Sequence, residues 1–251
     1  MSLRNGILGA TALLVIGIAT YVDYYIQERK VRLSPADPVA LEALVSSSSV
    51  KVTETDWYVF EPVGQQPQTG MIFYPGGECD ERGYAELLNA IAAEGYLVVL
   101  VPMPLQLAVL APNKAEDVTE AFPAIENWAI SGHSLGGAMA ARYVYNHPGE
   151  MQGLLFWDAY PPETDDISNR DLAVRLIHRS DETSKPPDYY TQYFPLLPDH
   201  MDMRPIIGGS HINFGRFIPA ERFRTAEPAT IPIEDQHQQI VSHSVDFLGQ
   251  L

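Results

Sequence analysis

Trp128-Ala129-Ile130-Ser131-Gly132-His133-Ser134-Leu135-Gly136-Gly137 is the stretch that decides the fold. An apolar run enters it, glycines stand two residues before and two residues after Ser134, and a run rich in small residues follows over 138–146. Glycines at these positions remove side chains that would collide where a strand turns sharply into a helix. We therefore expect a strand, a tight turn and a helix, with the hydroxyl of Ser134 raised above the sheet beside the helix N-terminus.

The regions on both sides of this turn alternate between β-branched apolar runs and helical patterns. Such alternation predicts an α/β fold with a mostly parallel sheet covered by helices. Pro205 has no N–H for a ladder, so the last strand is expected at a sheet edge. The expected strands are a leading hairpin over 50–60 and single strands over 71–74, 96–101, 128–132, 154–157, 173–177 and 203–207.

Two of the helices show in the periodicity of apolar residues. Tyr84, Leu87, Leu88 and Ile91 follow the i, i+3, i+4, i+7 spacing of one apolar stripe, and Gly95 is a suitable C-terminal cap. A second amphipathic helix is expected to open near residue 233 and to run toward the C-terminus.

Composition excludes some classes of function. Sixteen basic and thirty-two acidic residues leave a formal net charge of -16 over 251 residues, which disfavours nucleic-acid binding because phosphates would be repelled. The lone Cys79 cannot form an intrachain disulfide, and no Cys/His group has the spacing of a zinc site. We expect neither a metal nor an organic cofactor.

The N-terminus carries a membrane signal. Residues 6–22 contain no charged side chain, and a helix of that length would span roughly 26 Å, near the lower limit for a bilayer core. The interpretation is a single-pass anchor, so that the chain divides into an anchor or signal segment (1–30), a Pro- and Ser-containing linker (31–49) and a catalytic domain (50–251). A cleaved signal peptide and an ordinary buried helix are the alternatives.

The side of the membrane stays open. The basic residues after the segment outnumber Arg4, which favours a cytoplasmic domain, whereas an export-type leader would place the domain outside the cytoplasm.

A serine at such a turn needs a base, and the base needs an acid that orients it. In a sheet of this kind the chain order is serine, then Asp or Glu, then histidine. Of the seven histidines, only His211 directly follows the last expected strand, within the flexible Gly208-Gly209-Ser210-His211. Asp181 lies just past the penultimate strand and is our candidate acid, with Asp158, one strand earlier, as the runner-up.

Attack by a serine on a carbonyl creates an oxyanion, which requires hydrogen-bond donors already in place. The backbone N–H of Leu135, the residue after the serine, is one candidate. The other is expected in the turn Tyr74-Pro75-Gly76-Gly77, where we favour Gly77 and then Gly76.

These residues together resemble the α/β-hydrolase superfamily, and within it the dienelactone-hydrolase-like bacterial serine hydrolases with a membrane-proximal leader. The resemblance covers residues 50–250 and implies an eight-stranded, mostly parallel sheet and a triad at Ser134, Asp181 and His211. Two features depart from the group: Glu182 stands where a glycine commonly follows the acid, and a short Pro-Gly-Gly turn replaces the long oxyanion loop. The matching segments are 73–77, 101–104, 132–137, 158–161, 180–181 and 208–211.

The expected function is hydrolysis of a carboxylic ester, a small-molecule substrate, through an acyl-enzyme on Ser134. Acyl transfer by the same triad and a non-catalytic binding module on the same fold are the alternatives. Apolar residues near the expected mouth favour an apolar acyl or alcohol group, although ordinary packing explains them too; they are Met103, Leu105, Leu107, Phe214 and Phe217.

Overall fold

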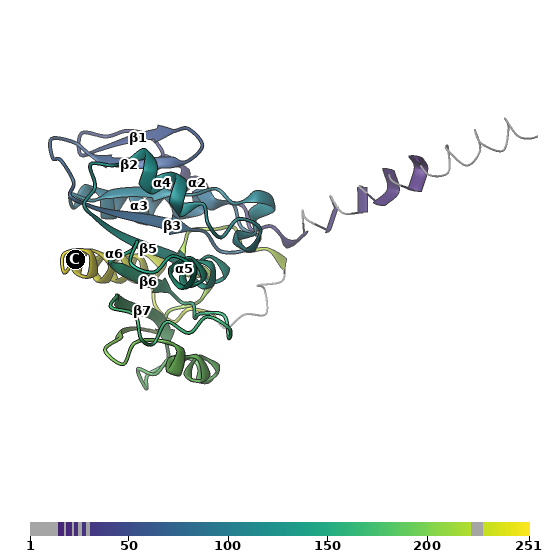
Figure 1. The fold of residues 1–251 in the computed structure, drawn as a ribbon. Helices are drawn as coiled ribbons and strands as arrows, with labels where there is room; N and C mark the ends of the chain where they lie inside the picture. Colours follow the sequence, from purple (N-terminus) through teal and green to yellow (C-terminus); the bar gives the residue numbers. More distant parts are fainter. Residues whose placement is uncertain (1–14, 18, 22, 25–26, 29–30, 222–227) are drawn as a thin grey trace, which may run out of the picture.

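One eight-stranded sheet forms the centre of the protein (Figure 1). The computed structural model describes residues 15–17, 19–21, 23–24, 27–28, 31–221 and 228–251. The strand order across the sheet is β1-β2-β4-β3-β5-β6-β7-β8. The strands are β1 (Val50–Glu54), β2 (Tyr58–Pro62), β3 (Thr69–Tyr74), β4 (Leu97–Leu100), β5 (Asn127–His133), β6 (Gly153–Trp157), β7 (Ala173–Ser180) and β8 (Asp202–Ile207).

The sheet is mostly parallel, as predicted. The β1–β2 and β2–β4 pairs are antiparallel, and every pair from β4 through β8 is parallel. β8, which contains Pro205, lies at the edge of the sheet, where a missing N–H disturbs only one ladder, so the prediction for this strand is confirmed.

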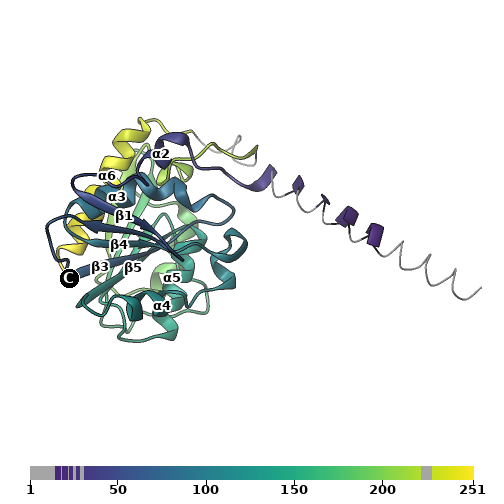
Figure 2. The ribbon, with the colours of Figure 1, turned by 90° about the horizontal axis from the view of Figure 1, so that it is seen from above.

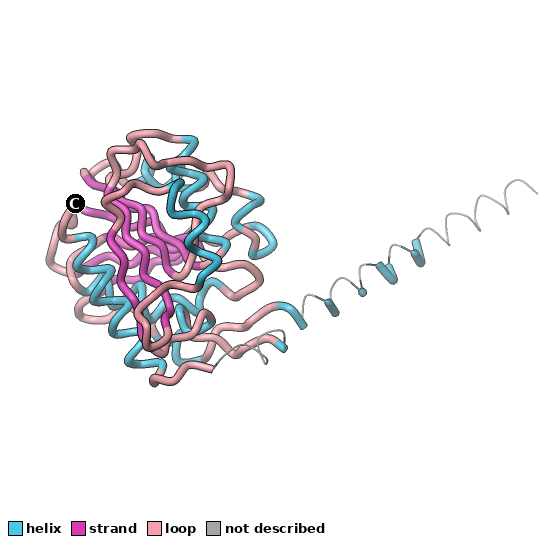
Figure 3. Tube along the Cα trace, turned by 90° about the horizontal axis from the view of Figure 1, so that it is seen from below, coloured by secondary structure: helices cyan, strands magenta, loops and turns pink. Residues whose placement is uncertain are grey.

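Helices cover both faces of the sheet (Figure 2). The α-helices are α2 (Pro38–Glu42), α3 (Ala85–Ala93), α4 (Ala115–Ala121), α5 (Leu135–Asn146) and α6 (Ile233–Leu248). Short 3-10 helices are η1 (Glu81–Tyr84), η2 (Pro104–Gln106), η3 (Ala108–Leu110), η4 (Asp188–Leu196) and η5 (Ile212–Phe214). Figure 3 shows the strands enclosed by these helices and their loops.

The two faces of the sheet bury separate apolar cores because successive strand residues point to opposite sides. One core joins Ile72 and Ile130 to α4 and α5, and the other joins Met71 and Phe73 to α3 and α6. The predicted stripe of α3 is buried in the second core, and the helix is followed by Gly95 at φ +105°, a conformation that favours glycine.

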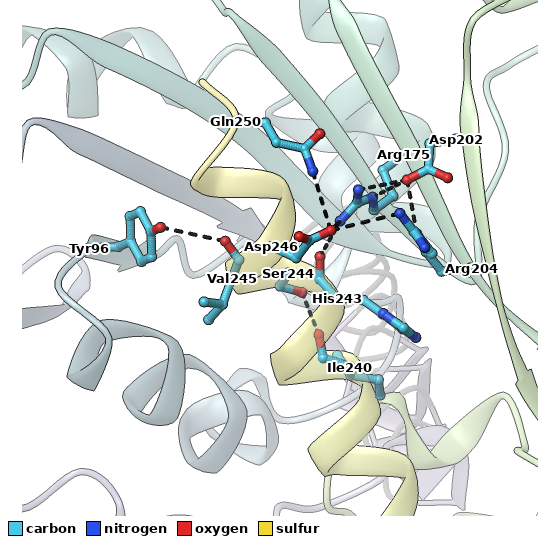
Figure 4. Close-up of polar contacts among 10 residues, drawn as sticks. All are labelled: Tyr96, Arg175, Asp202, Arg204, Ile240, His243, Ser244, Val245, Asp246 and Gln250. Carbon is cyan, nitrogen blue, oxygen red and sulfur yellow. Dashed lines mark hydrogen bonds and ion pairs between the residues drawn. The ribbon is translucent and has the colours of Figure 1, made fainter.

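Buried Arg175 fastens α6 to the edge of the sheet (Figure 4). From β7 it donates to the carboxylates of Asp202, at 2.7 Å, and of Asp246 on α6, at 2.8 Å, and to the carbonyl of His243, at 2.7 Å. These contacts lie where β7 and β8 begin, which is the end of the parallel strands opposite the turn at Ser134. The network therefore holds the fold together and takes no part in the site described below.

The stretch expected as a linker packs against the domain. Ser34 forms a bridge with Cys79, Ala36 forms one with Phe217, and Ala40 on α2 is fully buried. Residues 32–44 are thus a docked strap, which contains the short helix α2.

Much of the expected anchor, residues 6–22, lies outside the described residues. The described residues between 15 and 28 extend away from the sheet in Figure 1, and their large apolar side chains are exposed. Within the part of the chain that the structure describes, no helix is long and apolar enough to cross a membrane.

Candidate active site

Ser134 stands at the junction of β5 and α5 in a strained backbone conformation. Its φ of 52° and ψ of -120° are rare for a residue with a side chain. Its N–H donates to the carbonyl of Trp157 on neighbouring β6, and its own carbonyl accepts from Ala138 in the first turn of α5. Strand pairing on one side and the helix on the other therefore hold the strained residue in place.

The glycines of the turn are required by close backbone contact. A Cβ on Gly132 would lie 2.4 Å from the carbonyl carbon of Gly136, and one on Gly136 would lie 2.1 Å from the carbonyl oxygen of Tyr74. A Cβ on Gly137 would meet that of Ala159 at 2.4 Å. No real Cβ tolerates such contacts, so the strand-turn-helix predicted from the sequence depends on glycine at all three positions.

His211 is paired with Asp158 and not with Asp181. Nδ1 of His211 lies 2.6 Å from Oδ2 of Asp158. Asp158 directly follows β6, and its side chain is fully buried. An ionised carboxylate only accepts hydrogen bonds, so Nδ1–H is the donor and Nε2 keeps its lone pair. The expectation that placed Asp181 beside the histidine is wrong, and the runner-up occupies that place.

Asp181 is instead an exposed turn residue. Its carboxylate accepts from the backbone N–H of Thr183, at 2.8 Å, and from the Thr183 hydroxyl. These two bonds lower the pKa of the Asp181 carboxyl. An Asp side chain that accepts from the residue two positions on is typical of a surface turn. β7 continues to Ser180, three residues past its predicted end at 177, so the strand has already reached the surface where Asp181 begins.

Arg179 is a second partner of the buried acid. Its Nη1 donates to Oδ2 of Asp158, its backbone N–H donates to Oδ1 at 3.2 Å, and its Nη2 donates to the hydroxyl of Tyr189 at 2.8 Å. Burial raises the pKa of Asp158, but the hydrogen bond from His211 and the positive charge of Arg179 outweigh it and hold that pKa at about 2, below the ordinary 3.8. Asp158 is therefore a carboxylate at neutral pH.

A cavity of about 320 Å³ opens over this arrangement. Ser134 and His211 both line it, together with apolar Leu107, Leu135 and Phe217. Of the other apolar residues expected near the mouth, Met103 and Phe214 are packed in the two cores. Leu105 is half exposed outside the cavity lining.

The candidate oxyanion donors meet at the same cavity. Leu135 is the first residue of α5, where backbone N–H groups have no acceptor within the helix. A Cβ on Gly77 would lie 3.1 Å from the Leu135 side chain, so the two residues are neighbours. The N–H of Gly76 already donates to the hydroxyl of Tyr84 at 3.0 Å. The backbone N–H of Gly76 thus takes part in the hydrogen bonding of the cavity wall itself.

A buried hydrogen-bonded bridge, which the sequence did not indicate, links the glycine turn to the serine turn. The hydroxyl of Tyr84 accepts from Gly76 and lies 2.7 Å from Nδ1 of His133. The His133 ring lies 4.4 Å from that of His211 and stacks on Phe214.

Burial decides the charge states around this bridge. It lowers the pKa of His133 well below 6.5, so this ring is neutral. It raises the pKa of the Cys79 thiol to about 12, and the thiol donates to the carbonyl of Gly76 at 3.0 Å. The thiol is therefore unreactive at neutral pH. Within the described ranges, no group of three or more His, Cys, Asp or Glu side chains is placed to bind a metal ion.

Comparison with known proteins agrees with this fold. The model of a family described as the alpha/beta hydrolase family matches residues 70–238. No curated protein matches the chain.

Several solved structures have a similar fold. A ferulic acid esterase from Streptomyces cinnamoneus is 16% identical, with a TM-score of 0.56 over 75% of this chain and 68% of that one. Est1E from Butyrivibrio proteoclasticus is 11% identical, with a TM-score of 0.55 over 80% of this chain and 100% of the other. A thermophilic esterase from Thermogutta terrifontis is 12% identical, with a TM-score of 0.52 over 80% and 93%. At these identities the likeness shows a shared fold.

The Tyr84 bridge predicts a stability cost for losing one hydroxyl. Tyr84→Phe leaves the Gly76 N–H and the His133 Nδ1 buried without their partner, and we expect a loss of about 2 kcal/mol of unfolding free energy. Tyr96→Phe is the matched control, because its hydroxyl makes only a 3.5 Å contact with the carbonyl of Val245, and it should cost less than about 0.5 kcal/mol. Urea denaturation measures both, and equal effects would contradict the bridge.

Proposed function

The chain belongs to the α/β hydrolase family, and on that premise we propose that it is a serine esterase that hydrolyses a carboxylic ester through an acyl-enzyme on Ser134. One observation carries the proposal: the buried carboxylate of Asp158 pairs with His211, and His211 lines the same cavity as a serine held in a strained turn. Strained backbone of this kind is concentrated at functional sites.

Acylation begins when Oγ of Ser134 attacks the carbonyl carbon of the ester. Nε2 of His211 takes the hydroxyl proton as the bond forms, and Asp158 stabilises the resulting imidazolium through Nδ1–H. The tetrahedral intermediate then collapses, the bond to the alcohol oxygen breaks, and the leaving alcohol takes the proton from Nε2. An acyl group remains on Ser134.

Water completes the cycle by taking the place of the alcohol in the second half of the reaction. His211 removes a proton from the water as its oxygen attacks the acyl carbon, and the second tetrahedral intermediate expels Oγ of Ser134, which recovers the proton. The products are a carboxylic acid and an alcohol. The reaction needs no metal and no organic cofactor.

The negative charge of both intermediates falls on the former carbonyl oxygen. We assign the hydrogen-bond donors for this oxygen to the backbone N–H groups of Leu135 and Gly77. The two residues are distant in sequence but are neighbours in space and both line the cavity. The N-terminus of α5 adds its partial positive charge at the same point.

Acyl transfer to an alcohol would use the same residues, with the alcohol in place of water in the second step. A non-catalytic binding module is the other alternative. A strained serine turn and a buried carboxylate are both costly for a protein that only binds, which favours chemistry.

A fluorophosphonate probe tests the nucleophile, because it reacts only with a serine activated by a base. The intact protein should be labelled at Ser134 and should hydrolyse p-nitrophenyl acetate. Ser134→Ala should abolish both while changing unfolding free energy by less than about 1 kcal/mol, since the hydroxyl serves chemistry. Peptide mass spectrometry locates the label. A folded protein that takes up no probe and cleaves no ester would favour the binding module.

The acid is tested by comparing two aspartates. Asp158→Asn should lower kcat by about 10³-fold or more, because it removes the charge that orients and stabilises the imidazolium. Asp181→Asn should leave kcat within about twofold, because this side chain bonds only within its own turn. Since Asp158 has its pKa near 2, protonation of Asp158 should not limit the rate between pH 5 and 8. A larger loss from Asp181→Asn would overturn the assignment.

We also propose that residues 6–22 hold the protein at a membrane as an uncleaved single-pass anchor. The support is the uncharged run of seventeen residues, flanked by Arg4 and by a charged stretch beginning at Asp23. The intact chain should fractionate with membranes. Mass measurement of the mature N-terminus checks this, and a chain beginning at Thr20 would identify a cleaved leader instead.

A further inference from the structure

Exposed apolar side chains occur on two of the chain segments that line the catalytic cavity. Four of them are between 51% and 54% exposed: Leu105, Val109, Leu110 and Ile218. We call these four residues the apolar rim. Single exposed apolar residues are ordinary on protein surfaces, but several around one opening are characteristic of an interaction site.

The rim adjoins the cavity through the chain itself. Leu107, which lines the cavity, lies between Leu105 and Val109, and Phe217, which also lines it, precedes Ile218. The N–H of Glu78 in the cavity wall donates to the carbonyl of Gln106 at 2.9 Å, which ties this loop to the wall. The rim residues therefore lie on two separate segments, 104–110 and 215–218, each of which contributes a residue to the cavity lining.

The strap that follows the N-terminal segment contacts residues that line the same cavity. Arg32 pairs with Glu78 at 2.9 Å, Ser34 bridges Cys79, and Ala36 bridges Phe217. The purple N-terminal stretch accordingly meets the body of the protein beside the yellow-green segment that precedes the grey gap in Figure 1. Residues 32–36, which begin ten residues after the apolar run of 6–22 ends, therefore lie against cavity-lining residues.

We propose that the apolar rim docks on the surface of a lipid bilayer, so that the cavity opens toward the membrane and receives amphiphilic esters dissolved in it. This inference rests on the proposed esterase function and names its substrate class. Docking buries the four half-exposed side chains among lipid chains, where burial of apolar surface is favourable. A water-soluble ester can reach the same cavity without docking.

The net charge of -16 argues that apolar contact provides this docking. An acidic protein is repelled by anionic lipid headgroups, so attraction to surface charge cannot supply the binding energy. A bilayer of zwitterionic phosphatidylcholine is therefore the appropriate test surface.

Two esters that form the same acetyl-enzyme test the proposal with the full chain. p-Nitrophenyl acetate dissolves in water, whereas octadecyl acetate stays in phosphatidylcholine vesicles and must be reached at the bilayer. The rim variant combines Leu105→Asn, Val109→Gln and Leu110→Gln, none of which lines the cavity. Asparagine suits position 105, where φ is 54°.

The rim variant should hydrolyse p-nitrophenyl acetate at the wild-type rate and should release acetate from the vesicle-bound ester about tenfold more slowly. The matched control combines Val45→Gln and Val63→Gln, which are 70% and 50% exposed. Val45 lies between α2 and β1, Val63 directly follows β2, and neither lines the cavity, so both rates should stay unchanged.

Each outcome decides between the claims. Equal rates of rim variant and wild type on the vesicle-bound ester would overturn docking through the rim, as would an equal loss in the control. Inactivity of the wild type on p-nitrophenyl acetate would instead overturn the proposed function. A loss confined to the rim variant and to the vesicle-bound ester supports the membrane-facing mouth.

Discussion

The close backbone contact between β5 and α5 is the constraint on which the rest of the site depends. A Cβ on Gly132 would meet the backbone of Gly136, a Cβ on Gly136 would meet the backbone of Tyr74 at the end of β3, and Ser134 between the two glycines has a positive φ. Such strain persists only where surrounding structure overdetermines it. Here parallel pairing to β3 and β6 and the first turn of α5 supply that support, so the serine follows one of the two central strands of the sheet.

The charge balance around Asp158 follows from the same sheet. β6 lies directly beside β5, so a carboxylate at the end of β6 is buried against the serine turn. A buried carboxylate is stable only when it accepts hydrogen bonds or lies beside a positive charge. His211 and Arg179 both donate to Oδ2 of Asp158, and Arg179 also brings a positive charge. The arginine keeps its proton and its charge in this contact. The acid thus stays ionised and oriented.

The Tyr84 bridge joins the two turns that form the cavity wall. One hydroxyl satisfies the Gly76 N–H and the His133 ring, so the glycine turn after β3 and the serine turn after β5 cannot move independently. The same wall continues outward through Glu78 and Cys79 to the strap. The entrance is therefore built from chain segments that are distant in sequence, and its apolar rim becomes apparent only when they are assembled.

The sequence by itself determined the strands, the turn at Ser134 and the histidine that faces Asp158. Each of these follows from local rules: alternation of β-branched runs, glycines that a sharp turn requires, and the position of His211 after the last strand. All eight strands were predicted close to where they lie, and Pro205 correctly marked the edge strand.

Only the tertiary structure decided which carboxylate is buried. Asp158 and Asp181 both follow strands, and local sequence does not record that β7 runs on to the surface while β6 ends inside the molecule. The sequence also does not predict the roles of Tyr84, Arg179 and the docked strap. Arg179 pairs with Asp158, 21 residues away, and Tyr84 pairs with His133, 49 residues away. The strap is held by bridges between distant segments. Local sequence specifies backbone conformation, whereas the burial and pairing of polar side chains arise from packing between distant segments.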